Sequence, residues 1–127
     1  MAYEENTRAI TGKAGTAIEA YHFVRIAADG AYDHVDAAQL MPHGVSQEEQ
    51  ATVGGTFPVG VPDGGVYKVE AGEAIAVGDE IASNNAGEAI GIGSANGDMK
   101  AGVALEAALA DGDIIAFQFL PLGQINA

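Results

Sequence analysis

The segment KVEAGEAIAVGDEIASNNAGEAIGI, residues 68–92, decides the fold, because part of it has a counterpart earlier in the chain. Residues 13–18 read KAGTAI and residues 70–75 read EAGEAI. An offset of 57 residues aligns these two segments, and one inserted residue aligns the later ones. The anchors keep their order in both halves: Ala14 over Ala71, Ile18 over Ile75, Val24 over Ile81, Gly30 over Gly87, Gly44 over Gly102, Ala51 over Leu109 and Gly54 over Gly112.

This order of anchors favours an internal duplication over a chance match in an Ala- and Gly-rich chain. Two copies are too few for a solenoid, which needs about three repeats to bury a continuous core. Two β units that each expose an apolar face would instead pack on each other. The sequence therefore predicts a mainly β protein with quasi-twofold internal duplication, built as a compact antiparallel β-sandwich or a β-tulip-like barrel.

The local patterns favour short strands separated by tight turns. The chain has 18 Gly and 4 Pro, and TAIEAYHFVRI, residues 16–26, alternates as one strand or two consecutive short strands would. Asp29-Gly30 predicts a turn, and GDIIAFQFLPL, residues 112–122, predicts a buried strand that ends at Pro121. SQEEQATV (46–53) and ALEAALADG (104–112) are each either one helical turn or a strand-loop-strand connection.

The length of 127 residues suits one domain. We assign residues 13–127 to a single β domain, with copy one at 13–61, a crossing at 62–69 that contains Pro62 and Asp63-Gly64-Gly65, and copy two at 70–119. Residues 1–12 lie outside both copies and are either a frayed terminus or an extended arm that orders against a partner.

The charge is strongly acidic and unevenly distributed. The chain has 18 acidic and 5 basic residues, which gives a formal net charge of -13 at pH 7. Such a surface repels nucleic-acid phosphates and anionic membranes, and neither is an expected partner. The first 25 residues are balanced, with Arg8, Lys13 and Arg25 against Glu4, Glu5 and Glu19. The amino-terminal segment is thus the part best able to approach another acidic surface.

Several classes of site are excluded by composition or have no motif. The absence of cysteine excludes disulfides, zinc-thiolate sites and thiol catalysis, and the first residues do not resemble a signal peptide or membrane anchor. Asp33, His34, Asp36 and His43 are potential metal ligands, but neighbouring strand residues point to opposite faces. Glu48-Glu49 and GIGSANG (91–97) indicate a soluble loop and a turn. We expect no catalytic, metal or cofactor residues and no enzyme activity.

Lys100 supports one alternative. It follows Met99 just after an Asn-Gly turn, and carrier domains that hold biotin or lipoate on a lysine are also small, acidic, duplicated β structures. Such domains are usually shorter, and their modified lysine has stricter flanking residues.

The second half of the chain resembles the capsid decoration, or cement, proteins of tailed bacteriophages. The resemblance covers VGVPDGGVYKVEAGEAIAVGDEIASNNAGEAI (59–90) and AGVALEAALADGDIIAFQFLP (101–121). It consists chiefly of turn glycines. The matching positions are Ala71, Gly72, Ile75, Gly78, Asp79, Gly87, Ala89, Gly102, Ala104, Ala108, Gly112 and Asp113.

This resemblance implies a structural protein without an active site, made in the host cytoplasm and carried on the outer capsid surface of the virion. Such proteins are commonly homotrimers that bind the major capsid protein of the expanded shell and stabilise it. They often reach the shell with an amino-terminal arm, which would make Tyr3, Arg8, Ile10 and Lys13 the contact residues here. A fibre or adhesin module that binds a host surface or glycan is the alternative, although the aromatic residues Tyr21, Phe23, Tyr32 and Tyr67 form no evident cluster in the sequence.

Overall fold

The described part of the chain is entirely built from β-strands and turns. The structure is a computed structural model, and it describes residues 9–36, 40–91 and 99–124. The strands are β1 (Ala9–Lys13), β2 (Phe23–Ile26), β3 (Tyr32–His34), β4 (Gly44–Ser46), β5 (Thr56–Gly60), β6 (Val66–Glu70), β7 (Glu80–Ser83), β8 (Ala89–Gly91), β9 (Met99–Ala104) and β10 (Ile114–Gln124). Within these ranges there is no helix that could cross a membrane.

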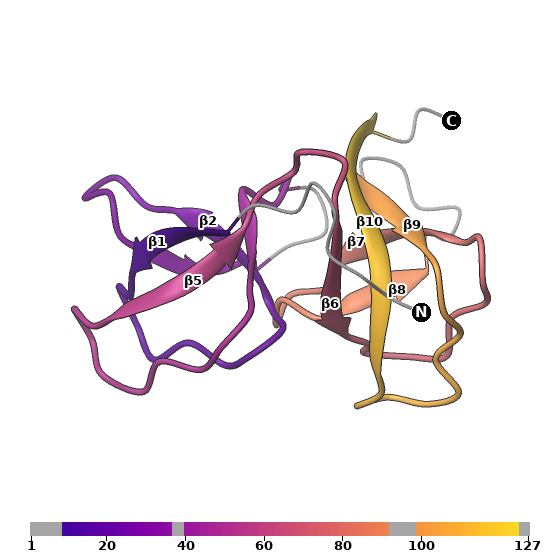
Figure 1. The fold of residues 1–127 in the computed structure, drawn as a ribbon, viewed down its shortest axis with the longest axis horizontal. Coiled ribbons are helices and arrows are strands. Elements are labelled where there is room, and N and C mark those ends of the chain that lie inside the picture. The colour runs from indigo at the N-terminus through magenta and orange to yellow at the C-terminus, as the bar shows by residue number, and fades with distance from the viewer. Residues whose placement is uncertain (1–8, 37–39, 92–98, 125–127) are drawn as a thin grey trace.

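The strands form two antiparallel five-stranded sheets with the same connectivity. The first sheet has the order β1-β5-β4-β2-β3, and the second has the order β6-β10-β9-β7-β8. The two sheets lie side by side as two units, β1–β5 and β6–β10 (Figure 1). The fold is therefore all-β and compatible with a sandwich, but not with one closed barrel, and its strand order repeats as the sequence predicts.

Matching backbone contacts support the repeat residue by residue. Outside the strands, Ala14 bridges Tyr32 in the first unit, and Ala71 bridges Ala89 in the second. A second pair of bridges joins Ile18 to Gln50 and Ile75 to Ala108. Turns match as well, because positive φ angles occur at three aligned pairs of positions: Gly30 and Gly87, Gly54 and Gly112, Tyr21 and Gly78.

Each unit has its own apolar core at aligned positions. The core of the first unit consists of Ala14, Ile18, Val24, Tyr32, Phe57 and Val59. The second core is larger and includes the aligned residues Ala71, Ile75, Ile81, Ala89, Ile115 and Phe117. Large side chains occupy different positions in the two units, since Tyr32 aligns with Ala89 whereas Val59 aligns with Phe117. Large and small side chains have thus exchanged positions between the two cores.

The larger core also joins the two units. Phe23, Val35 and Val45 belong to the first unit, yet they are buried in the core of the second. The Phe23 ring lies 5.5 Å from that of Phe117 and 5.9 Å from that of Phe119, both in edge-on geometry. Residues 61–65 connect the units and are held against β10, because Gly64 N–H donates to the Phe119 carbonyl. We call the contact between the units the junction.

The first strand of each copy begins earlier than expected. Residues 9–12 were assigned to the arm, but they belong to β1, which pairs with β5 from Ala9↔Gly60 to Lys13↔Thr56. The crossing 62–69 likewise contains most of β6. Neither strand has a long apolar alternation, and both are edge strands of their sheets. Their backbone pairing, which the side-chain pattern does not show, defines them. Residues 1–8 lie outside the described residues.

The structure decides between the alternatives for two connections and corrects the end of the last strand. The segments 46–53 and 104–112 contain no helical turn: β4 and β9 end there, and bends, turns and the bridges at Gln50 and Ala108 follow, as in a strand-loop-strand connection. The last strand does not end at Pro121. β10 continues to Gln124, with a register shift between Phe119 and Gly123 that accommodates the proline.

Candidate functional site

The predicted contact residues lie at the start of the chain, and the structure describes two of them. Ile10 and Lys13 are exposed residues of β1, with 45% exposure for Ile10. Tyr3 and Arg8 fall outside the described residues. The structure therefore locates half of this candidate surface on a sheet edge, and it does not test whether that edge contacts a capsid.

Within the described ranges, the outer edge of β1 has backbone groups without a strand partner. Pro58 directs its carbonyl toward β4, where it accepts from Gln47 N–H at 3.0 Å. Because strand residues alternate between neighbours, Phe57 and Val59 bond to β1, and Thr11, which pairs with Pro58, directs its backbone N–H and C=O away from the sheet.

The matching edge of the second sheet is covered by the first unit. In β6, Glu70 N–H donates to the Tyr21 carbonyl at 2.8 Å. The Lys68 carbonyl accepts from the Gln47 amide at 3.2 Å. Lys68 and Glu70 align with Thr11 and Lys13, so the same edge is paired in one unit and open in the other.

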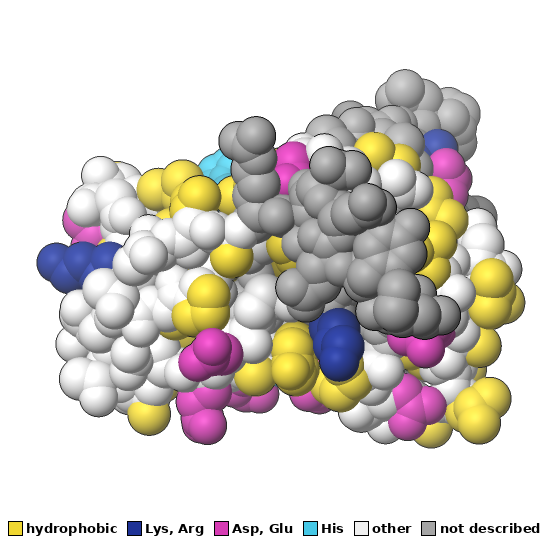
Figure 2. All heavy atoms as spheres, viewed as in Figure 1, with side chains coloured by type: hydrophobic (Ala, Val, Ile, Leu, Met, Phe, Trp, Pro, Cys, Tyr) yellow, Lys and Arg dark blue, Asp and Glu magenta, His cyan; other side chains and the backbone are white. Residues whose placement is uncertain are grey.

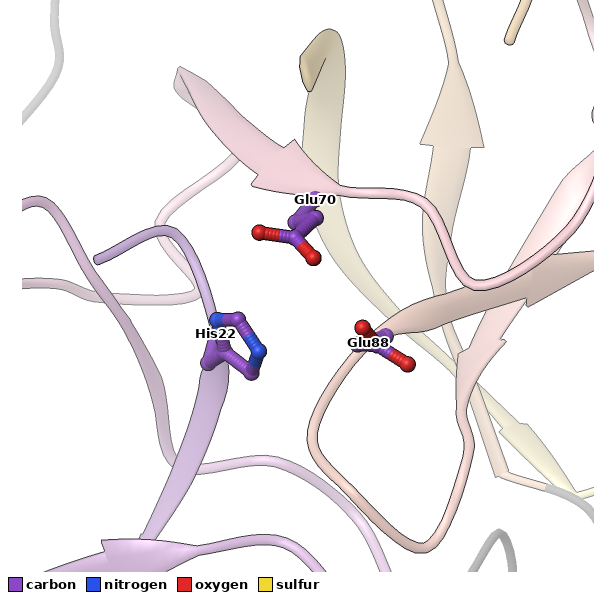
Figure 3. A group of neighbouring side chains, drawn as sticks. All are labelled: His22, Glu70 and Glu88. Atoms are coloured by element: carbon purple, nitrogen blue, oxygen red, sulfur yellow. The ribbon is translucent and has the colours of Figure 1, made fainter. Parts of the chain in front are cut away.

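A second candidate is a side-chain cluster at the junction. His22 lies immediately before β2, Glu70 ends β6, and Glu88 lies immediately before β8. Figure 3 shows the imidazole of the first unit facing the two carboxylates of the second. One potential ligand atom from each residue lies within 4.8 Å of the other two.

Hydrogen bonds fix the His22 ring at this cluster. The side chain of His22 is 3% exposed. Its Nδ1 lies 2.8 Å from the Ala20 carbonyl, which can only accept, so Nδ1 is the donor in this contact. Nε2 lies 3.4 Å from Oε2 of Glu19, a largely exposed side chain.

The two carboxyl groups also influence each other. Burial raises the pKa of Glu70, and a hydrogen bond shared with Glu88 raises it further, while the nearby His22 acts in the opposite direction. Glu88 in turn accepts from the Asn84 amide at 3.0 Å. The cluster therefore holds two neighbouring carboxyl groups that disfavour simultaneous ionisation.

The histidines and acids considered from the sequence serve other contacts. His34 Nε2 accepts from Glu19 N–H at 3.1 Å, and His43 Nδ1 accepts from Ile26 N–H at 2.9 Å. The pKa of His34 is lowered by burial and then by His22, whose ring lies 5.2 Å away. Burial also lowers the pKa of His43, with a further contribution from Arg25. Glu48 and Glu49 are exposed.

Sequence reasoning missed the junction cluster because its residues come from different copies. The alignment places Lys13 over Glu70, His22 over Asp79, and Ala31 over Glu88. Each pair thus differs in chemistry. Positions where the two copies differ in charge were the only sequence signal available, and they do not show which residues meet in space.

Four exposed apolar residues of the second unit lie in the connections before β7 and β10 and at the first residue of β10. They are Val77, Leu105, Leu109 and Ile114, with Leu109 86% exposed. The aligned residues of the first unit are Ala20, Gln47, Ala51 and Thr56. Figure 2 shows hydrophobic side chains on the second unit, and acidic side chains on the visible face of both units. We call these four residues the apolar end.

Lys100 lies within β9, and its Nζ is 3.3 Å from Glu80 Oε1. GIGSANG begins with Gly91 at the end of β8, and its remaining residues lie outside the described ranges. The described geometry therefore gives Lys100 an ion pair within a sheet, whereas the turn before it is not described.

Comparisons with known proteins point to tailed-phage particles. The chain is similar to the crystal structure of the "head fiber gp8.5 N base" of bacteriophage phi29, with a TM-score of 0.69 and 21% identity. That similarity covers 95% of this chain and 99% of the other, and at this identity it shows a shared fold. No curated protein matches the chain.

A family model described as "Phage cement protein" matches residues 3–119. The matched range includes β1 to β9 and much of β10, and thus both units and the junction. The chain belongs to the phage cement protein family.

Proposed function

We propose that this protein is a capsid decoration protein that binds the outer surface of an expanded phage shell, mainly its major capsid protein, and stabilises it. The family match over residues 3–119 carries this proposal. A ligand that binds only the expanded lattice stabilises it by mass action, and many bound copies add their contributions. This role requires binding surfaces and no catalysis.

The charge distribution supports an orientation on the shell. The acidic excess lies in residues 26–127, whereas residues 1–25 are balanced. The amino-terminal segment can therefore approach an acidic capsid with the least repulsion, while the acidic body faces solvent and keeps particles apart.

We further propose a homotrimer assembled through the β1 edge. Within one chain, the matching β6 edge is covered by the first unit through the Tyr21 carbonyl and the Gln47 amide. A second chain can cover the β1 edge of the first through backbone hydrogen bonds. When such head-to-tail contacts close into a ring of three chains, every β1 edge is covered, and the β3 and β8 edges take no part in the contact.

Capsid binding is tested with a truncation that begins after the arm. Removing residues 1–13 would delete β1, so the informative change is removal of residues 1–8. We expect the truncated protein to fold and to lose capsid binding, because it lacks Tyr3 and Arg8. Co-sedimentation with expanded capsids and with procapsids measures occupancy. Wild-type occupancy by the truncated protein would show that the arm is not the contact.

The apolar end supplies the comparison variant. Val77→Ser together with Leu109→Ser removes exposed apolar area and leaves buried positions unchanged. If the arm makes the contact, this double variant binds capsids as the wild type does. Loss of binding in the double variant, with binding retained by the truncation, would assign the contact to the apolar end. A wild-type protein that binds no expanded capsid would overturn the proposed function.

A fibre base is the second candidate. The similar phi29 structure is described as the base of a head fibre, which favours a module that holds or extends a fibre from the shell. A glycan-array signal from the isolated protein would favour a host-binding fibre module. Saturating co-sedimentation with shells and no glycan signal would favour the cement function.

A further inference from the structure

We propose that His22, Glu70 and Glu88 form a divalent metal site, best suited to Zn²⁺, that links the two units across the junction. The first ligand comes from the first unit and the other two come from the second. This inference concerns the protein itself and does not depend on which capsid surface it binds.

Among the described residues, no Lys or Arg pairs with the carboxylates at the junction. Glu70 and Glu88 are both half-buried. Within the described ranges, the Lys ion pair joins Lys100 to Glu80 and involves neither carboxylate. Adjacent half-buried carboxylates require a proton or a cation between them, because isolated charges are costly to remove from water.

His22 supplies the feature that distinguishes a metal site from a pair of acids. Its Nδ1 is bonded to the Ala20 carbonyl, and its Nε2 edge faces the carboxylates in Figure 3. Metal-binding histidines commonly have this arrangement, in which a carbonyl accepts from one ring nitrogen and sets the tautomer that offers the other to the metal. Because the ring is nearly fully buried, Nε2 has few other possible ligands.

The backbone of each proposed ligand is held in place. His22 N–H donates to Ser46 Oγ at 3.0 Å. Glu88 N–H donates to Asn84 Oδ1 at 2.9 Å, and Glu70 N–H donates to the first unit at the Tyr21 carbonyl. These bonds fix the backbone positions of the three residues. The carboxyl groups of Glu70 and Glu88 can still move by rotation about their side-chain bonds.

One nitrogen and two carboxylates favour Zn²⁺ over the alkaline-earth ions. Zn²⁺ accepts imidazole and carboxylate ligands, whereas Mg²⁺ and Ca²⁺ prefer all-oxygen sites. Ligands in a tetrahedral zinc site lie about 3.4 Å apart, given bonds of about 2.1 Å. The ligand atoms here lie within 4.8 Å of one another, so rotations of the Glu side chains have to bring them closer by at most about 1.4 Å. Oε2 of Glu19, 3.4 Å from Nε2, can supply the fourth ligand.

The test uses the full-length chain without a histidine tag, treated with EDTA and then dialysed. Isothermal titration with ZnCl₂ measures stoichiometry and affinity, and MgCl₂ serves as the comparison ion. We expect one Zn²⁺ per chain, a melting temperature that rises with free Zn²⁺, and no comparable response to Mg²⁺. Replacement by Co²⁺ should give the visible absorption of a tetrahedral site.

Glu88→Gln is the main variant, because Glu88 lies at a turn and its substitution keeps the shape of the side chain. We expect it to weaken Zn²⁺ binding at least tenfold, and Glu70→Gln to do the same. Glu48→Gln, on an exposed loop, is the matched control and should bind as the wild type does.

Two results would overturn the proposal. One is the absence of a saturable Zn²⁺ response in the folded wild type. The other is equal affinity in Glu88→Gln and Glu48→Gln, which would assign the binding to scattered surface acids. Capsid co-sedimentation of the EDTA-treated protein is measured separately, so failure of the metal site leaves the capsid proposal intact.

Discussion

At the scale of single residues, two aligned glycines leave the least room for a side chain. Gly44 and Gly102 occupy matching positions in β4 and β9. A methyl group at Gly44 would overlap Val59, and one at Gly102 would overlap the Gln118 carbonyl oxygen. The side chain of Val59 can rotate, but the backbone of β10 cannot move without disturbing its pairing with β6 and β9. The requirement for glycine is therefore stricter at Gly102.

We predict that Gly102→Ala lowers the free energy of unfolding by about 3 kcal/mol, the upper end of the usual cost of overpacking. Gly91→Ala is the control, because its added methyl group would lie 3.5 Å from Glu73 at ordinary contact distance. Urea unfolding followed by circular dichroism measures both variants. Equal stability of the two variants would show that β9 and β10 can separate at this point.

Residue patterns predicted the turns better than the site. Gly30, Gly87 and Gly112 were expected in turns, and all three have positive φ angles. Such glycines can be predicted from the sequence because the need for a positive φ angle arises within the turn itself. His22, Glu70 and Glu88 could not be grouped from the sequence, because their proximity depends on how the two units pack.

At the scale of strands, the middle and end of each copy were predicted better than its beginning. The alternation near residues 16–26 and the apolar run after Gly112 have strong side-chain patterns, and β2 and β10 lie there. β1 reads AITGK, and its one buried residue is Gly12, so its sequence carries little sign of a strand. Backbone pairing with β5, rather than burial of side chains, defines this strand.

The open β1 edge gives a prediction about assembly. Thr11→Pro removes an N–H that faces away from β5, so the sheet should remain intact while the proposed contact between chains is lost. Light scattering after size-exclusion chromatography should give three times the 12.8 kDa chain mass for the wild type and a single chain for the variant.

Thr11→Ala keeps the backbone N–H and should remain trimeric, which separates the backbone contact from any contact of the side chain. A trimeric Thr11→Pro protein would show that the chains meet at another surface. A monomeric wild type would contradict the homotrimer itself.

At the scale of the whole molecule, one aromatic side chain couples the units. Phe23 is fully buried and extends from the first sheet into the core of the second. Its aligned residue is Glu80, which faces Lys100. The two copies therefore differ clearly at this position, where a side chain of the first unit is buried in the core of the second.

We predict that Phe23→Ala lowers the free energy of unfolding by about 3–5 kcal/mol and separates unfolding into two calorimetric transitions, because it empties the junction. Phe57→Ala removes a ring of the same size from the core of the first unit and leaves Phe23 in place. It should lower the free energy of unfolding but leave a single calorimetric transition, because the junction is unchanged. A single transition for Phe23→Ala at the wild-type midpoint would mean that other contacts couple the units.

The short connection at residues 61–65 has a consequence for how strong the junction needs to be. Five residues extend over at most about 17 Å, so each unit always has its partner at a local concentration in the millimolar range or above. Two separate chains with the same junction would need a far larger or more apolar contact to remain associated at cellular concentrations. The covalent connection thus makes a modest contact sufficient. It allows polar residues such as the buried His22 and the half-buried Glu70 and Glu88 to occupy an interface that would otherwise have to be apolar.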